Sequence, residues 1–588
     1  MCGIVGFVGK RKCVKSLIET LSKLEYRGYD SAGVSWFENQ VIKTLKKTGK
    51  IQNLIDEIDE QKTFSVGIAH TRWATHGKPN EINAHPHVSK NGTWAMVHNG
   101  IIENYKELKS KYNLNPESET DTAVLSELLE YSKAKNISDF IDVFENVDGS
   151  FAISAICKNK PNSLFLAKNK SPLYVAENEK HEFMIASDPI CFAEFSKEFY
   201  FLEDGEFAEI SQNKITFYCG EKIEIKKQSQ KLSEIFEDTS KGKFEHFMLK
   251  EIMEEKQVIL NLIEAYKSKR ILEKFDDWFL SKFNEIKFIG CGTAYHASLM
   301  GAKFVQKKLG KTASAEMASE FIYGKPNFIN PKTLYVFVSQ SGETADTLRA
   351  LELVKENECT SIALTNVLYS RLAKTTDFIL PISAGVEIAV ASTKAYVCML
   401  ASIYLFCEFF NSKKNYEMAF ENLKNLAENI LKFDAKNLDK IAEEIATKKE
   451  AIFIGKDMDY ITSLEASLKL KEVTYINSNS YPAGELKHGF LALVENGMPL
   501  FVFANQKEMK NKTLSAMNEA ISRGANEIVF TNDKNFEGKN VIFCKSQDEI
   551  LAQIECISAM QYLSYRVSIL KNINPDQPRN LAKSVTVE

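Results

Sequence analysis

The feature that most constrains the fold of this chain is an internal repeat in its C-terminal half. Three short segments recur at a constant offset of 165 or 166 residues. The pairs are Phe288-Ile289-Gly290 with Phe453-Ile454-Gly455, Tyr335-Val336-Phe337-Val338 with Leu500-Phe501-Val502-Phe503, and Thr365-Asn366 with Thr531-Asn532. Single apolar matches arise by chance, but a constant offset over three of them indicates two similar subdomains.

Apolar strands alternate with helical stretches around these segments. Strands are expected at residues 286–290, 334–339 and 361–365. This alternation is typical of a doubly wound parallel sheet, so we expect α/β subdomains at 277–417 and 442–578.

The first part of the chain has a different pattern. Short alternating strands are expected at residues 63–69, 93–98, 150–157 and 163–167, which favours stacked antiparallel sheets with helices. A charged, weakly patterned stretch at 228–243 is followed by helical periodicity over 250–267. In this multidomain chain of 588 residues we therefore expect one domain at 1–240 and a linker with a helical segment at 241–276.

Composition argues against several classes of function. The 74 basic and 78 acidic residues give a formal net charge of -4, so no nucleic-acid partner is expected. The eleven cysteines form no CxxC pair, which indicates reduced thiols and a cytoplasmic location. The amino terminus is too short for the apolar region of a signal peptide, and no apolar run reaches membrane-spanning length, so no membrane partner is expected.

The residue that follows Met1 is a candidate nucleophile. Removal of Met1 would leave the thiol of Cys2 and a free α-amino group on one residue. An α-amine with a pKa of about 7.7–8.0 can take the proton of a thiol with a pKa of about 8.5. Taken alone, Cys2 is more often a buried structural cysteine, so its interpretation depends on the motifs around it.

Five motifs accompany Cys2. They are Tyr26-Arg27-Gly28-Tyr29-Asp30-Ser31-Ala32-Gly33, His70-Thr71-Arg72-Trp73-Ala74-Thr75-His76-Gly77, Asn83-Ala84-His85-Pro86-His87, His98-Asn99-Gly100 and Glu119-Thr120-Asp121-Thr122. Together they resemble the N-terminal-nucleophile glutamine amidotransferases. The resemblance implies an αββα sandwich in which the thiolate attacks the glutamine amide, releases ammonia and leaves a thioester that water hydrolyses.

The resemblance also implies a role for each matching residue. Cys2 is the nucleophile, and the Asn99 side chain with the Gly100 N–H forms the oxyanion hole. Arg72 binds the α-carboxylate of glutamine and Asp121 its α-ammonium group. The remaining pocket residues expected from the resemblance are Trp73, Thr75, His76 and Gly77, and Trp73 is also expected to gate an ammonia path.

Five of the nine histidines lie between positions 70 and 98, and His85-x-His87 could suggest a metal site. No cysteine or HExxH helix accompanies them, so hydrogen-bonded histidines are the better interpretation. We expect no metal and no cofactor. Gly290-x-Gly292 lacks the third glycine of a dinucleotide fingerprint, which argues against a nicotinamide cofactor.

A serine-rich turn between strand and helix is a candidate anion site. It reads Ser339-Gln340-Ser341-Gly342-Glu343-Thr344, directly before a helix expected near Ala345. Hydroxyls and free N–H groups at a helix N-terminus can surround a phosphate. Such a turn by itself is more often only a helix N-cap.

With the repeat, Gly290-Cys291-Gly292-Thr293 and Val390-Ala391-Ser392-Thr393-Lys394 resemble the sugar isomerase domains of the aminosugar synthases. The resemblance implies a sugar-phosphate site made of Thr293, Ala294, Ser339, Gln340, Ser341, Thr344, Val390, Ser392, Lys469 and Ala582. Ala294 stands where this family usually has serine, which removes one hydroxyl but leaves a backbone N–H that could serve. Phe490 replaces a usual proline, and Glu255-Lys256 replaces a common Gln-Pro.

Three charged residues of the second subdomain fall on one helical face. Glu465, Lys469 and Glu472 are spaced i, i+4 and i+7, and Leu464, Leu468 and Val473 are available to supply the core. A solvated face of salt bridges is the usual explanation. The resemblance instead implies that Glu472 moves a proton between C1 and C2 of the sugar and that His488 assists ring opening.

The polar C-terminal tail, 579–588, would ordinarily be expected to fray. The resemblance implies that this tail covers the sugar and that Lys583 forms a Schiff base with the open-chain ketose. The expected reaction converts fructose 6-phosphate and glutamine into glucosamine 6-phosphate and glutamate. The expected assembly is a homodimer that completes the sugar site across subunits.

Two alternatives compete with this interpretation. Another ammonia-channelling amidotransferase, acting on a phosphoribosyl substrate, would need consecutive acidic residues after a strand, which the sequence lacks. A catalytically silent sugar-phosphate sensor would not need both Cys2 and Lys583.

Overall fold

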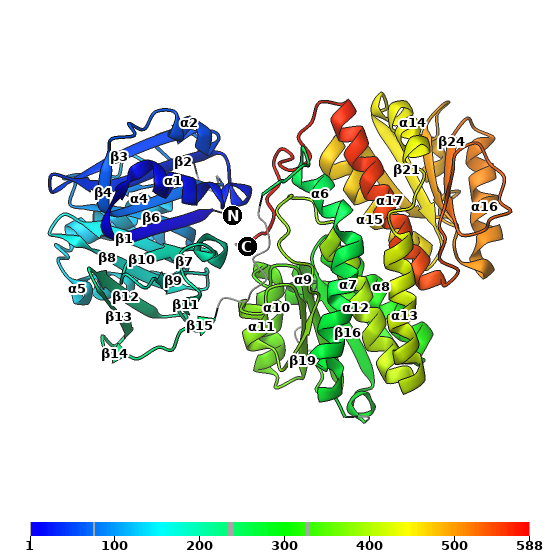
Figure 1. Ribbon diagram of the computed structural model, residues 1–588, viewed down its shortest axis with the longest axis horizontal. Coiled ribbons are helices and arrows are strands. Elements are labelled where there is room, and N and C mark those ends of the chain that lie inside the picture. The colour runs from blue at the N-terminus through cyan, green and yellow to red at the C-terminus, as the bar shows by residue number, and fades with distance from the viewer. Residues whose placement is uncertain (1, 74–76, 232–239, 277, 325–327, 587–588) are drawn as a thin grey trace. The chain divides into compact units, whose positions relative to one another are not determined.

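A computed structural model describes residues 2–73, 77–231, 240–276, 278–324 and 328–586 (Figure 1). The chain divides into two compact units, Met1–Thr239 with Ser584–Glu588, and Ser240–Lys583. Thr75 and His76, two of the residues expected in the glutamine pocket, lie outside the described residues.

The first unit contains two antiparallel sheets. In spatial order the first sheet has β15 (Gln230–Lys231), β11 (Glu198–Phe201), β9 (Tyr174–Glu177), β10 (Phe183–Ala186), β1 (Gly3–Cys13), β4 (Thr63–Arg72), β2 (Ser31–Glu38) and β3 (Val41–Thr48). The second has β14 (Glu224–Ile225), β13 (Lys214–Cys219), β12 (Glu206–Ser211), β8 (Lys160–Asn169), β7 (Gly149–Cys157), β6 (Trp94–Ile102) and β5 (His87–Val88).

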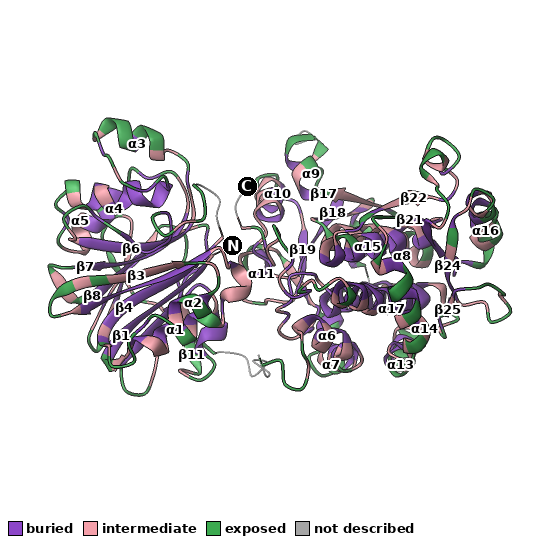
Figure 2. Ribbon diagram, turned by 90° about the horizontal axis from the view of Figure 1, so that it is seen from above, coloured by how far each residue is buried: buried purple, intermediate pink, exposed green. Residues whose placement is uncertain are grey.

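Helices cover the outer faces of the two sheets. Helices α1 (Val14–Ser22) and α2 (Ile51–Ile55) pack on the first sheet, whereas α4 (Asp121–Tyr131) and α5 (Ile137–Phe144) pack on the second, and α3 (Tyr105–Lys111) packs on α4. An apolar core that includes Ile4, Val66 and Val97 lies between the sheets. Strand β1 is buried on both faces, which explains why its first residues form a continuous apolar run (Figure 2). The predicted αββα sandwich is confirmed.

The second unit contains two parallel sheets of the same strand order. The first has β17 (Thr312–Met317), β16 (Glu285–Gly290), β18 (Thr333–Ser339), β19 (Ser361–Thr365) and β20 (Phe378–Pro381). The second has β22 (Asn477–Pro482), β21 (Glu450–Gly455), β23 (Pro499–Phe503), β24 (Asn526–Thr531) and β25 (Val541–Phe543). The predicted pair of doubly wound subdomains is confirmed.

The repeat extends to backbone conformation. Helix α8 (Thr293–Leu309) follows β16 in the first subdomain, and α15 (Met458–Thr474) follows β21 in the second. The residue before α8, Gly292, has φ 54° and ψ −126°, and its counterpart Asp457 has φ 52° and ψ −119°. The two strand-to-helix turns therefore have one conformation although their sequences differ.

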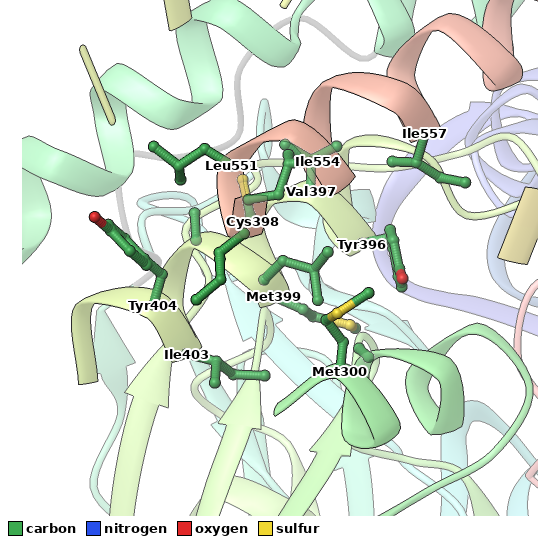
Figure 3. Packing of buried hydrophobic residues seen from close by; sticks show 14 of the residues in the cluster. Met300, Tyr396, Val397, Cys398, Met399, Ile403, Tyr404, Leu551, Ile554 and Ile557 are labelled. Carbon is green, nitrogen blue, oxygen red and sulfur yellow. The ribbon is translucent and has the colours of Figure 1, made fainter. Parts of the chain in front are cut away.

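Helices α8 and α15 both contribute to one large apolar core of the second unit. The others are α6 (Phe247–Met253), α7 (Glu255–Ser268), α9 (Ala318–Gly324), α10 (Ala345–Glu356), α11 (Arg371–Thr375), α12 (Lys394–Asn411), α13 (Lys413–Asn429), α14 (Ala435–Ala446), α16 (Lys507–Ile521) and α17 (Glu549–Leu570). Figure 3 shows Val397 and Met399 of α12 near Ile554 of α17 and Met300 of α8. This packing joins the two subdomains into one unit.

The helical stretch expected over 250–267 is observed, but it begins at Phe247 and is divided in two. The structure has α6 and α7 with a break at Glu254. No helix in the described part of the chain is both long and apolar enough to cross a bilayer.

Candidate active sites

Cys2 lies immediately before β1, against the end of β4. Its Sγ accepts the N–H of Trp73 at 3.3 Å, and Gly3 pairs with Thr71 in the sheet. Burial raises the pKa of the Cys2 thiol, although the Trp73 N–H and the Arg72 guanidinium act in the opposite direction. A thiol with a raised pKa needs a base to become a nucleophile, and an α-amino group on the same residue would supply one.

Asn99 and Gly100 lie on β6, beside Cys2. The Asn99 Nδ2 donates to the carbonyl oxygen of Cys2 at 2.9 Å. Gly100 has φ +137°, and a Cβ at this position would lie 1.9 Å from the carbonyl oxygen of Ser150, so only glycine fits. The structure thus places the Asn99 side chain, one of the two expected oxyanion donors, against the residue that carries the thiol.

Arg72 and Asp121 are both buried in this region. The Asp121 carboxylate accepts the N–H groups of Ile102 at 2.8 Å and of Thr122 at 2.9 Å. Burial lowers the pKa of Arg72, while Cys2 and Asp121 act to raise it, which places these groups within electrostatic range of each other. A guanidinium and a carboxylate here can bind the two charged α-substituents of an amino acid.

Four buried histidines lie close together near Asn99, namely His70, His85, His87 and His98. The rings of His70 and His85 have centroids 4.3 Å apart, and those of His85 and His87 are 4.7 Å apart. Burial lowers the pKa of His70 to about 3 and also lowers the pKa values of His85, His87 and His98. These imidazoles are therefore neutral near pH 7.

The serine-rich turn lies between β18 and α10. Ser339 Oγ accepts the N–H of Gly342 at 3.0 Å and lies 3.2 Å from the hydroxyl of Thr344. Gly342 has φ +65°, and a Cβ there would lie 2.1 Å from Ser370 Oγ. Thr344 occupies the N-cap position of α10, yet its side chain makes no capping hydrogen bond. Hydroxyls and helix N–H groups at this turn can donate to a phosphate.

The backbone N–H of Ala294 itself is already engaged in a hydrogen bond within the protein. That N–H donates to the carbonyl oxygen of Cys291 at 3.0 Å. A phosphate here would depend on the hydroxyls of the serine-rich turn and of Thr293.

The charged face of α15 points inward. Glu465 and Lys469 have 0% exposed side chains, so the explanation as a solvated face is wrong. Of the three expected core residues, Val473 is buried, whereas Leu464 and Leu468 are half-buried. Lys469 Nζ lies 2.7 Å from Glu472 and 3.4 Å from Glu465. Burial acts to lower the pKa of Lys469, but the two carboxylates outweigh burial and raise it.

This network joins the two subdomains. Lys469 donates to the Thr293 hydroxyl at 3.1 Å, and that hydroxyl donates to Glu465 at 3.1 Å. His296 Nδ1 lies 2.7 Å from the other oxygen of Glu465. A predicted phosphate residue of the first subdomain is therefore in direct contact with predicted sugar-site residues of the second.

Lys583 is buried against Glu387. Its ammonium group is hydrogen-bonded to Glu387 Oε2, and the side chains are 4% and 0% exposed. The same carboxylate accepts the N–H groups of Thr393 at 2.9 Å and Ala395 at 3.0 Å and the hydroxyl of Ser392 at 3.1 Å. Burial opposes ionisation of Glu387, but Lys583 and these donors outweigh burial and lower its pKa.

The base of the C-terminal segment is fixed by Asp576. Its carboxylate accepts the N–H groups of Phe247 at 2.9 Å and Met248 at 2.8 Å at the start of α6, and its carbonyl accepts the N–H of Val390 at 3.1 Å. Ala582 is half-buried, next to Lys583. Residues 576–583 are thus held in place, which contradicts a frayed tail up to Lys583.

Of the six predicted catalytic residues, all of which are described, His488 alone is exposed. The structure does not bring it into the network of Glu465, Lys469 and Glu472.

Two further carboxyl groups near Lys583, those of Glu387 and Glu251, were not expected from the sequence. Glu251 accepts the N–H groups of Ile388 at 2.6 Å and Ala389 at 3.1 Å, which fixes the backbone next to Glu387. Burial, together with the charge of Glu387, raises the pKa of Glu251 to about 8. The available signal for Glu387 was a lone carboxylate within the apolar run of residues 384–391.

The second subdomain fills its own equivalent turn with a carboxylate. Asp459, the repeat counterpart of Ala294, is 0% exposed. It accepts the N–H groups of Asn505 at 3.1 Å and Gln506 at 3.2 Å and the Gln553 amide at 2.9 Å. An internal anion thus occupies the donors that would face a phosphate.

Glu255, one of the departures noted above, predicts a pH-dependent stability. Its carboxyl is fully buried, and burial raises its pKa from 4.5 to about 8. Between these two values the folded chain holds a proton that the unfolded chain has lost. Rising pH therefore lowers the free energy of unfolding there, by about 1.4 kcal/mol for each pH unit. Glu255→Gln should raise the melting temperature at pH 8–9 and much less at pH 5.

The control is Glu264→Gln, at an exposed position of the same helix. Thermal unfolding of both variants between pH 5 and 9 checks the prediction. An advantage of Glu255→Gln that does not grow with pH would contradict it.

Comparison with known proteins agrees with this geometry. A glutamine amidotransferase domain model matches residues 70–194, and an SIS domain model matches residues 279–408 and 444–553. The C-terminal domain of glucosamine-fructose-6-phosphate aminotransferase from Francisella tularensis is 34% identical, with a TM-score of 0.54, and covers 58% of this chain and 100% of its own.

Curated relatives match along the full length. A glutamine–fructose-6-phosphate aminotransferase (isomerizing) from Clostridium tetani is 40% identical, and one from Fusobacterium nucleatum is 38% identical, each with 100% of both chains covered. This chain therefore belongs to the glutamine–fructose-6-phosphate aminotransferase (isomerizing) family.

Proposed function

We propose that this chain converts fructose 6-phosphate and glutamine into glucosamine 6-phosphate and glutamate, the first step towards activated amino sugars. The observation that carries the proposal is the burial of Lys583 against Glu387 in the sugar isomerase unit. A lysine in a polar segment would ordinarily be solvated, and the burial of Lys583 beside the loop that holds Ser392 suits a covalent role.

In the first unit, Cys2 attacks the glutamine amide carbon and its own α-amine accepts the thiol proton. Asn99 Nδ2–H and the Gly100 N–H stabilise the tetrahedral oxyanion. Arg72 and Asp121 hold the α-carboxylate and α-ammonium groups, with the pocket completed by Trp73, Thr75, His76 and Gly77. The released ammonia passes to the sugar site, with Trp73 as its gate.

In the second unit, the phosphate is bound by Ser339, Gln340, Ser341, Thr344 and Thr293, and Val390, Ser392 and Ala582 contact the sugar. Lys583 loses its proton and attacks the C2 carbonyl of the open-chain ketose, whose oxygen leaves as water when the Schiff base forms. Ammonia then displaces the lysine, and Glu472 moves a proton from C1 to C2. Lys469, held between Glu465 and Glu472, keeps that carboxylate in place.

We propose a homodimer in the cytoplasm, in which His488 assists ring opening in the sugar site of the partner subunit. The exposure of His488 supports this assignment, because an exposed imidazole is available to a second chain. The proposed domain limits are 1–240, 241–276, 277–417, 442–578 and a tail at 579–588.

The proposal is tested by incubating the Met1-processed protein with both substrates and quantifying both products by mass spectrometry. Equal amounts of glutamate and glucosamine 6-phosphate are expected. Glutamate without aminosugar would leave only a glutaminase, and neither product would favour a sugar-phosphate sensor.

A further inference from the structure

His70 lies beside Asn99, completely buried, and bridges the two sheets of the first unit. Its Nε2 lies 3.0 Å from the carbonyl oxygen of His98 and 3.1 Å from Asn99 Oδ1. Both partners are oxygen acceptors, so Nε2 must carry a hydrogen to satisfy them. The geometry therefore fixes the tautomer of His70 as the Nε2–H form.

The amide of Asn99 is anchored at both ends. Its Oδ1 accepts from His70, and its Nδ2 donates to the carbonyl oxygen of Cys2 at 2.9 Å. A half-turn of the amide would set Oδ1 against the Cys2 carbonyl and the amide N–H groups against the Nε2–H of His70. Both contacts would then be repulsive, and each buried group would lose its partner.

The anchored orientation leaves one hydrogen for catalysis. An amide nitrogen carries two hydrogens, and the Cys2 carbonyl uses one of them. The second belongs to the same NH2 group beside the nucleophile, where an oxyanion forms. If the amide turned, a carbonyl oxygen would face the developing negative charge instead of a donor.

The surroundings of His70 keep it a neutral donor. Its Nδ1 is buried and has no hydrogen-bond partner among the described residues, and the ring lies against that of His85. Burial lowers the pKa of His70 to about 3, and the nearby Arg72 guanidinium also disfavours a second positive charge.

We propose that His70 is a positioning residue for glutamine hydrolysis, which holds the Asn99 amide with its N–H donor directed at the oxyanion. This inference rests on the proposed function, in which Asn99 stabilises that oxyanion.

The test compares His70→Gln with His70→Met. The two side chains have nearly equal length, but only glutamine can place an N–H near the position of Nε2. Two probes separate ground-state from oxyanion binding. Glutamate binds non-covalently. The γ-aldehyde analogue of glutamine instead forms a covalent bond between the Cys2 sulfur and its own carbonyl carbon. The carbonyl electron pair then moves to oxygen, which occupies the oxyanion hole, and the thiol proton goes to the α-amine.

We expect His70→Met to lower kcat for glutamine hydrolysis by about 10²-fold, the loss seen when one oxyanion donor is removed. Affinity for the aldehyde should fall by a similar factor, while KM for glutamine and affinity for glutamate change less than about 3-fold. His70→Gln should restore most of both losses. Unchanged aldehyde affinity in His70→Met, or equal losses for glutamate and aldehyde in both variants, would overturn the proposal.

Asn99→Ala, measured in parallel, separates this proposal from the proposed function. If Asn99→Ala loses affinity for the aldehyde and His70→Met does not, the assignment of Asn99 to the oxyanion hole stands and the positioning role of His70 is refuted. If Asn99→Ala retains its affinity for the aldehyde, both the oxyanion role of Asn99 and the positioning role of His70 are refuted.

Discussion

Replacement of Lys583 by alanine is expected to abolish formation of glucosamine 6-phosphate while glutamine hydrolysis continues. In the structure, the Lys583 ammonium group is buried against Glu387, whose carboxylate also binds the hydroxyl of Ser392. Removal of the amine removes the only group proposed to form the Schiff base. We expect the rate of aminosugar formation to fall on the order of 10⁵-fold or more, the scale of losing a covalent nucleophile.

Lys583→Arg is the matched control. Arginine keeps the positive charge for Glu387, but its guanidinium is not deprotonated in proteins and cannot form a Schiff base. This variant should therefore be as inactive as Lys583→Ala in aminosugar formation. Coupled measurement of glucosamine 6-phosphate and glutamate checks both variants. Activity of Lys583→Arg above about a tenth of the unmutated rate would show that Lys583 acts only through its charge.

Replacement of Cys2 by alanine is expected to reduce glutamine hydrolysis by on the order of 10⁵-fold or more, because no other group is proposed to attack the amide. The fold should be retained, since the contact of Cys2 with Asn99 is made by its backbone carbonyl and only the Sγ hydrogen bonds to Trp73 are lost. Glutamate release, measured beside an unchanged melting temperature, checks this prediction.

A second variant tests whether the α-amino group of Cys2 is the base that takes the thiol proton. An N-terminal extension that prevents removal of Met1 keeps the thiol of Cys2 but converts its α-amine into an amide. Because burial raises the pKa of this thiol, hydrolysis should fall nearly as far as in Cys2→Ala. Full activity with the extension would show that another group takes the thiol proton.

The sequence predicted the strands well because the apolar runs at 286–290, 334–339 and 361–365 lie in parallel sheets whose strands are buried on both faces. Each of these strands is observed within one residue of its expected limits. The break at Glu254 could not be predicted, because helical periodicity continues through it.

The candidate site was predictable only where residues lie in compact motifs. The burial of the charged residues on α15 could not be predicted, because i, i+4 spacing is the same on a helix face that meets solvent and on one that faces the protein interior. Glu387 and Glu251 do not lie in a recognisable sequence motif. They act as hydrogen-bond acceptors for the backbone near Lys583, a role that depends on tertiary structure. The hydrogen bonds of the Asp459 carboxyl group could not be predicted for the same reason. Their donors lie near β23, α16 and α17, far from Asp459 in the sequence.

The most direct test of the central claim, that both sites act in one reaction, is a tracer experiment. The processed protein is supplied with fructose 6-phosphate, glutamine labelled with nitrogen-15 in its side-chain amide, and an excess of unlabelled ammonium salt. We predict that glucosamine 6-phosphate carries the label almost completely, because ammonia reaches the Lys583 site without mixing with solvent. Unlabelled aminosugar, or labelled ammonia with no aminosugar, would contradict the account.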